Sequence, residues 1–245
     1  MFEIECPENI PAETCERISE IINRLSSILE NYIRLDNRFK FRIKVGKKEK
    51  VVILTLKSLE EPLAFPITWD LEQDDIENLR NIVSNVIKSY LKLAKGLGFL
   101  PKWVMEGITH ALAYHVLIEF YPDAKGDIEK RYFWEKMPSL ESIIAWSDTR
   151  AERIIASLAQ IGGDVTDIIA KIKQTAEKLS ENETDQTLRA GVMKLFVNLC
   201  DKETLPKLID RIAEEKPQNY EMINKLLKET CGRDVEEAYK LCLGK

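Results

Sequence analysis

The chain has 245 residues and a formal net charge of −5 at pH 7, with 44% apolar and 31% charged residues. A chain of this length and composition buries a substantial core, which excludes wholesale disorder. The acidic balance argues against a protein whose bulk binds nucleic acid or an anionic membrane. No apolar run approaches the ~20 residues that cross a bilayer, and the first residues show no signal-peptide pattern. We therefore predict a cytoplasmic protein without a membrane partner.

The cysteines and the overall composition give two further indications. Ile, Lys and Glu are abundant and Gln is scarce, as in proteins from hot environments. The cysteines are odd in number and contain no C-x-x-C pair, which is a weak signal for disulfides or a structural zinc site. We expect most of them to be small apolar fillers or exposed thiols. They are Cys6, Cys15, Cys200, Cys231 and Cys242.

The first part of the chain predicts a helix followed by strands. Apolar residues recur at three- and four-residue steps between Pro11 and Asp36, which indicates a long amphipathic helix with proline near its first turn. The segment FKFRIKV alternates apolar and basic residues, as a half-exposed strand does. The β-branched run VVILTL indicates a strand buried on both faces. LAFPITW adds a third strand, which Pro66 interrupts.

The chain after about Asp70 predicts helices alone. A period of 3.6 residues marks segments near 74–95, 101–121, 139–146, 148–161, 183–200, 204–215, 218–230 and 234–242. A Gly stop followed by an Asp cap occurs twice, in GGDVTDII at 162–169 and in CGRDVEEAY at 231–239. This order of elements predicts an α+β fold with an all-helical C-terminal half. We expect one domain at 1–147 and a helical subdomain at 148–245.

The stretch LPKWVMEGITHALAYH, residues 100–115, resembles the LPxWxxEGxA segment of gluzincin zinc metallopeptidases. In that family its glutamate is the third zinc ligand, and a preceding helix carries H-E-x-x-H, which supplies two metal-binding histidines and a general base. The closing LLKETCGRDVEEAYKLCL is similar to the helical tail of the same family. The resemblance implies a zincin-like fold: an N-terminal helix, a small mixed β-sheet, two site helices and a helical half.

The resemblance also implies that the catalytic residues are missing. The helix expected before Glu106 contains no histidine, and the family spacing places NVIKS, residues 85–89, opposite H-E-x-x-H. Asn85 and Ser89 would then occupy the ligand positions, and Val86 would replace the base. A carboxamide and a hydroxyl are not normal zinc ligands, and an isopropyl group cannot accept a proton from water. We expect no catalytic residue and a vestigial site formed by Asn85, Val86, Ser89 and Glu106.

Glu106 and His110 are the candidates for residual metal binding. They lie four residues apart on one predicted helix, a spacing at which two side chains share an ion or bond to each other. A bound metal would need further ligands from elsewhere, so an ordinary polar pair on a packed helix is the competing interpretation. His115 falls on an apolar stripe, where we expect a hydrogen-bonded core histidine. Leu100 and Trp103 are expected to pack at the entrance of the helix.

Basic residues gather between Arg34 and Lys50. On the predicted strand Lys40, Arg42 and Lys44 share one face and the aromatic residues share the other. This pattern suits a strand with aromatics in the core and lysines that protect an exposed edge from aggregation. The alternative is a peptide- or anion-binding edge, at which an extended chain pairs with the strand or a phosphate backbone meets the basic side chains.

Three functions follow from these patterns. The first is a non-catalytic metallopeptidase-like protein without a cofactor, which binds or scaffolds a peptide or protein partner. The second is a metal-dependent hydrolase, with zinc held by atypical ligands around Glu106 and His110. The third is a helical-repeat-like interaction protein unrelated to peptidases. The motifs G-x-x-x-x-G-K-[ST], G-x-G-x-x-G and G-x-S-x-G are absent, so no motif indicates a phosphate-binding loop or the nucleophile elbow of a hydrolase.

Overall fold

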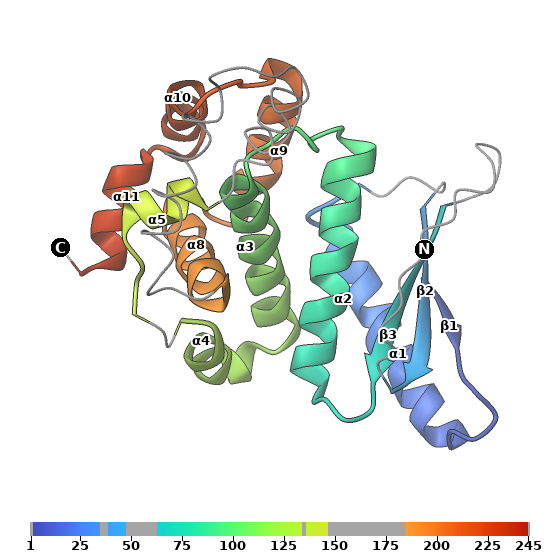
Figure 1. The fold of residues 1–245 in the computed structure, drawn as a ribbon. Coiled ribbons are helices and arrows are strands. Elements are labelled where there is room, and N and C mark those ends of the chain that lie inside the picture. Colours follow the sequence, from blue (N-terminus) through green and yellow to red (C-terminus); the bar gives the residue numbers. More distant parts are fainter. Residues whose placement is uncertain (1, 35–38, 48–62, 134–135, 147–184, 245) are drawn as a thin grey trace, which may run out of the picture. The chain divides into compact units, whose positions relative to one another are not determined.

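The structure is a computed structural model that describes residues 2–34, 39–47, 63–133, 136–146 and 185–244 (Figure 1). The chain forms two compact units. The first unit comprises Met1–Tyr90 and Leu112–Ile128, and the second comprises Leu91–Ala111 and Glu129–Lys245. The coarse prediction is confirmed, because a helix and a small sheet come first and the described C-terminal part is mostly helical.

The sheet of the first unit consists, among the described residues, of parallel strands in the order β1-β2-β3. Their bounds are β1 Phe2–Glu5, β2 Phe39–Gly46 and β3 Leu63–Asp70. The predicted mixed sheet is therefore wrong for these strands. β1 is only four residues long and was not predicted, and helix α1, Ala12–Leu29, connects it to β2. A helical crossover of this kind makes two neighbouring strands parallel.

The predicted strand LAFPITW is confirmed as β3. Pro66 lies inside it, opposite Arg42 of β2. A proline cannot donate a ladder hydrogen bond, and sheets tolerate it on outer strands, which is where β3 lies among the three described strands. The predicted strand VVILTL lies outside the described residues.

The two faces of β2 differ as predicted. Phe39, Phe41, Ile43 and Val45 are at most 5% exposed, whereas the basic residues between them are exposed. Helix α1 packs against β1, and helix α2, Asp75–Ser89, packs against β3. The aromatic face of the strand therefore belongs to the core of the first unit.

A buried asparagine ties β3 to α2. The side chain of Asn78 is fully buried; its Oδ1 accepts the N–H of Asp70 at 2.7 Å, and its Nδ2 donates to the carbonyl of Asp70 at 2.8 Å. Asp74 caps the helix by accepting the N–H of Glu77. Helix α2 continues into a π-helical turn, η1 at Tyr90–Ala94, and the chain then turns at Gly96, whose φ of 67° suits glycine.

Helix α3, Lys102–Phe120, contributes its first half to the second unit and its second half to the first. The other α-helices that the structure describes in the C-terminal part run from 6 to 15 residues in length. They are α4 Lys125–Phe133, α5 Leu140–Ala145, α8 Asp185–Leu199, α9 Thr204–Glu215, α10 Tyr220–Cys231 and α11 Val235–Cys242. The predicted helix at 148–161 and the predicted domain boundary after residue 147 lie outside the described residues.

The carboxylate of Asp185, at the start of α8, joins three elements of the second unit. It accepts the indole N–H of Trp146 at 3.0 Å and lies 3.2 Å from the ammonium of Lys102 and 2.9 Å from the guanidinium of Arg189. The ammonium of Lys102 also lies 4.3 Å from the centre of the Trp146 ring, which adds a cation–π contact. The start of α3, the end of α5 and the start of α8 therefore meet at one charge.

The junction of α10 and α11 confirms one predicted pair of capping residues. Gly232 ends α10 with a φ of 75°, and Asp234 begins α11 with a capping box in which its side chain and that of Glu237 bond to each other's backbone N–H. The corresponding pattern at 162–169 lies outside the described residues.

Four of the five cysteines form disulfides, Cys6–Cys15 and Cys200–Cys231, and Cys242 is free and buried. The expectation of fillers and exposed thiols is wrong for these four, because only the folded chain brings each pair together. Disulfides persist in oxidising compartments and in intracellular proteins of hyperthermophiles, so the cytoplasmic localisation stays a prediction. Within the described residues no helix is long and apolar enough to span a membrane.

We expect protein purified without reductant and unfolded in guanidinium chloride to react with a thiol reagent at one cysteine per chain, and at five after reduction. The reacting thiol should map to Cys242 by peptide mass spectrometry. Reaction at all five cysteines before reduction would contradict both disulfides.

Candidate functional site

The segment that resembles the LPxWxxEG motif forms the first turns of α3. Leu100 is 2% exposed, and the carbonyl of Pro101 accepts the N–H groups of Val104 and Met105, each at 3.1 Å. Proline suits the start of a helix, because its fixed φ is already helical and no N–H is needed there. Residues 103–109, which follow this start, are all buried, so the helix is enclosed on every side here.

Trp103 lies at the centre of an aromatic cluster in the second unit. It is 2% exposed, and its ring centre lies 6.0 Å from that of Phe196 on α8 and 6.2 Å from that of Tyr220 on α10. Tilted rings at these separations pack favourably. The predicted packing role of Leu100 and Trp103 is confirmed.

Gly107 lets α8 approach the backbone of α3. A Cβ atom at this position would lie 2.2 Å from Cδ2 of Phe196, well inside van der Waals contact. The ring of Phe196 therefore occupies the space that any side chain would take. The glycine of the motif has a packing function here, independent of any chemistry at the neighbouring glutamate.

Glu106 and His110 form the expected pair. Glu106 Oε2 lies 2.8 Å from His110 Nε2, and the two side chains are only 10% and 13% exposed. A nearly buried carboxylate needs such a partner, since an unsatisfied charge in the interior is costly. Among the described residues no group of three or more His, Cys, Asp or Glu side chains could hold a metal ion. The two side chains therefore bond to each other along the helix.

The other residues of the vestigial site belong to the first unit. Asn85 is exposed, and its carboxamide donates to the carbonyl of Asn81 at 2.8 Å. Val86 is fully buried in the core, and Ser89 is half-buried one turn after Asn85. The position expected for a general base is thus filled by a core residue, whose side chain carries no titratable group.

His115 is half-buried. Its ring centre lies 5.3 Å from that of Tyr114, and the two rings meet edge to face. One turn further on, Glu119 accepts the hydroxyl of Tyr32 at 2.6 Å and the carboxamide of Asn31 at 3.3 Å. Burial, and then the bond to Glu119, raise the pKa of Tyr32, which keeps this phenol protonated. These contacts fasten the end of α3 to the end of α1 inside the first unit.

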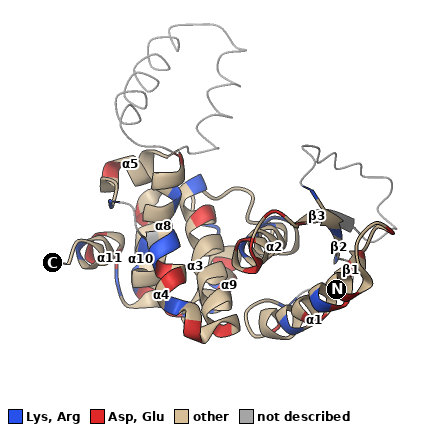
Figure 2. Cartoon of the chain, turned by 90° about the horizontal axis from the view of Figure 1, so that it is seen from below, with Lys and Arg blue, Asp and Glu red and all other residues tan. Residues whose placement is uncertain are grey.

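The strand that carries Lys40, Arg42 and Lys44 is not an edge strand among the described strands, and peptide or anion binding by these residues stays a prediction. β2 lies between β1 and β3 among the described strands, so its backbone is paired on both sides. On the exposed face Lys40 lies 2.8 Å from Glu3, and Arg42 lies 3.0 Å from Glu5. The acidic residues come from β1, the short strand that the sequence did not reveal. Lys44 is exposed on the same face, and Figure 2 shows acidic and basic residues interspersed on the ribbon.

A pocket of about 100 Å³ lies in the second unit, beside the aromatic cluster. One wall comes from the segment before and at the start of α3 together with α5, and the other from the α9–α10 connection and the start of α10. Its lining residues are Phe99, Pro101, Trp103, Ile144, Pro217, Gln218, Asn219, Tyr220 and Ile223. Walls of this kind accept one apolar side chain. Gln218 and Asn219, which carry the amide groups of the lining, are exposed to solvent.

Burial raises the pKa of Tyr220, and the negative charges of Glu236, Asp234 and Glu221 raise it further. Sequence patterns did not reveal this pocket, because its two walls come from segments that are distant in the sequence, residues 99–103 with Ile144 and residues 217–223. Two of its lining residues, Pro101 and Trp103, belong to the LPxWxxEG segment.

Comparisons with protein-family models, with curated proteins and with solved structures find no match to this chain.

We expect Gly107→Ala to lower the free energy of unfolding by about 1–3 kcal/mol, because the added methyl group would displace Phe196 from a tightly packed contact. Chemical denaturation of the two proteins measures the change. Gly126→Ala is the control, since a Cβ on this residue of α4 meets nothing within 4 Å, and it should be neutral or slightly stabilising. Equal effects of the two substitutions would contradict the packing role of Gly107.

Proposed function

We propose that this protein is a non-catalytic, peptidase-like protein that binds a peptide or protein partner. The observation that carries the proposal is the bond between Glu106 and His110, in which the carboxylate that resembles a zinc ligand is paired along its own helix. A gluzincin-type site would need this carboxylate turned toward a metal held by two histidines, whereas the preceding helix has Asn85, Val86 and Ser89 in their place.

The aromatic pocket supports the binding half of the proposal. Its walls are apolar and aromatic, and residues of this kind anchor the side chains of protein partners. We assign to the pocket one apolar side chain of the partner, with the neighbouring acidic residues favouring a partner that carries basic residues beside it.

A metal-dependent hydrolase is the second candidate, because the 2.8 Å separation places two donor atoms of Glu106 and His110 side by side. We expect untagged protein equilibrated with zinc and then dialysed to retain less than about 0.1 zinc per chain, since two protein ligands leave a tetrahedral ion incomplete. Elemental mass spectrometry measures the content. About one zinc per chain, lost in Glu106→Gln and kept in the exposed control Glu221→Gln, would replace our proposal by the hydrolase.

Binding can be tested with a random-peptide phage library panned against the whole protein. The peptides that are recovered should share an apolar anchor next to a basic residue, and Gln218→Trp, which places a large ring at the pocket, should weaken their binding by at least about tenfold. Lys225→Trp is the matched control at an exposed position of α10 and should leave binding unchanged. Failure to recover any peptide, or equal binding to both variants, would count against the pocket.

A further inference from the structure

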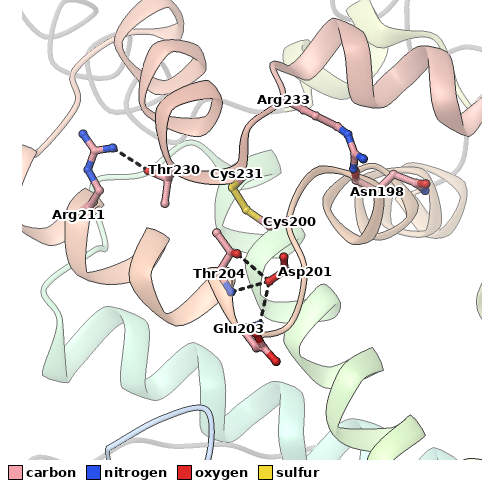
Figure 3. The surroundings of a disulfide bond; sticks show 9 residues. All are labelled: Asn198, Cys200, Asp201, Glu203, Thr204, Arg211, Thr230, Cys231 and Arg233. Carbon is pink, nitrogen blue, oxygen red and sulfur yellow. Dashed lines mark hydrogen bonds between the residues drawn. A yellow bond between two sulfur atoms is a disulfide. The ribbon is translucent and has the colours of Figure 1, made fainter.

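The Cys200–Cys231 disulfide closes the base of the helical hairpin formed by α9 and α10 (Figure 3). Cys200 directly follows α8, and Cys231 is the last residue of α10. The two cysteines are 31 residues apart in the sequence, and both helices of the hairpin lie within the loop that the bond closes. The bond therefore joins the end of α8 to the end of the hairpin.

The α9–α10 hairpin is a packing unit of its own. Among the helices that the structure describes in the second unit, α8 packs closely against α11 and α9 against α10, whereas α10 contacts α11 more sparsely. Each helix of the hairpin has an apolar stripe that is at most 2% exposed. The stripes consist of Leu205, Leu208, Ile209 and Ile212 on α9, and of Ile223, Leu226 and Leu227 on α10.

Polar contacts hold the base of the hairpin around the disulfide. The carboxylate of Asp201 accepts the N–H groups of Glu203 and Thr204 and the hydroxyl of Thr204, which begins α9. Arg233, just after α10, donates to the carbonyl of Asn198 at the end of α8. These bonds lie at the same place as the disulfide, so they act together with it on one junction.

Non-covalent ties also connect the hairpin to the rest of the second unit. Asn224 Oδ1 of α10 accepts the N–H of Val235 at 2.9 Å, and the ammonium of Lys228 lies 2.9 Å from the carboxylate of Asp234. Lys95 pairs with Asp210 at 2.5 Å, but both side chains are solvent-accessible, and exposed ion pairs contribute little. At the other end of the hairpin, Tyr220 meets Trp103 across the pocket. One covalent bond at the base thus supports a non-covalent contact at the tip.

The thiol chemistry suits a bond that opens and closes at this position. Cys231 is half-buried, whereas Cys200 is 2% exposed, so an attacking thiolate reaches the sulfur of Cys231. The remaining cysteine, Cys242, has its sulfur 3.5 Å from the carboxamide of Asn198. Burial raises the pKa of Cys242 to about 11, so it stays a thiol at neutral pH and does not compete in the exchange.

We propose that the Cys200–Cys231 disulfide is a redox latch, which holds the α9–α10 hairpin in place and, through it, the wall of the aromatic pocket. A dithiol reductant opens it. Its thiolate attacks Sγ of Cys231, the S–S bond breaks, and Cys200 leaves as a thiolate that takes a proton. The second thiol of the reductant then displaces Cys231, so the protein gains two electrons and two protons while the reductant becomes a disulfide. The consequence for partner binding rests on the proposed function.

Hydrogen exchange of the whole protein, measured by mass spectrometry, tests the latch without a partner. In Cys200→Ser/Cys231→Ser, amide protection in α9 and α10 should fall by at least about tenfold while α8 and α11 keep theirs. Cys6→Ser/Cys15→Ser, which removes the disulfide of the first unit, is the matched control and should leave the hairpin unchanged. Wild-type protein reduced with dithiothreitol should repeat the result of the first variant.

Two outcomes of the exchange measurement would overturn the latch. One is unchanged protection of α9 and α10 in both the serine variant and the reduced protein. The other is an equal loss in α8 and α11, which would mean that the bond stabilises the whole unit.

If the panning experiment recovers no peptide, the proposed function fails while the exchange data still decide the latch. If peptides bind, the serine variant should weaken them at least about tenfold, and equal affinity would uncouple the latch from the pocket.

Discussion

The contact of the Phe196 ring with the bare backbone of Gly107 is the packing constraint on which the second unit depends. It brings the ring of Phe196 on α8 so close to α3 that residue 107 has no room for a side chain. The same ring borders Trp103, which in turn borders Tyr220, so the helix spacing is transmitted across one aromatic cluster to α10. A second glycine, Gly191 of α8, admits Pro138 in the same manner. Close approach at glycine, rather than interdigitated long side chains, sets the position of α8.

Charge and a covalent bond complete this arrangement at the two ends of α8. At the start of α8 the carboxylate of Asp185 accepts the indole N–H of Trp146 and pairs with Lys102 and Arg189. The Cys200–Cys231 bond acts at the other end of the same helix. In the chain-entropy model, closing a loop of this length contributes roughly 3–4 kcal/mol to stability, more than any single exposed ion pair in the unit. The ends of α8 are thereby fixed by two different kinds of interaction.

The resemblance of residues 100–115 to a zinc-peptidase segment acquires a different meaning in this structure. Each residue that carries it has a packing or pairing function within the second unit: Pro101 starts the helix, Trp103 fills the cluster, and Gly107 receives Phe196. Glu106 is satisfied by His110 one turn away. The same sequence motif can therefore occur in a segment that binds a metal and in a segment that only packs helices together. The pairing of the carboxylate is what favours binding over catalysis in our proposal.

Local patterns in the sequence were sufficient for the elements whose signals are local. The apolar repeat of α1, the alternation of β2, the Gly232 stop with its Asp234 cap, and the i,i+4 pair of Glu106 and His110 all follow from residues within a few positions of one another. The tertiary structure alone decided the parallel pairing of β1 with β2, the disulfide partners and the two walls of the pocket. Each of these joins segments distant in the sequence, and no periodicity or spacing records which distant segment a residue will meet.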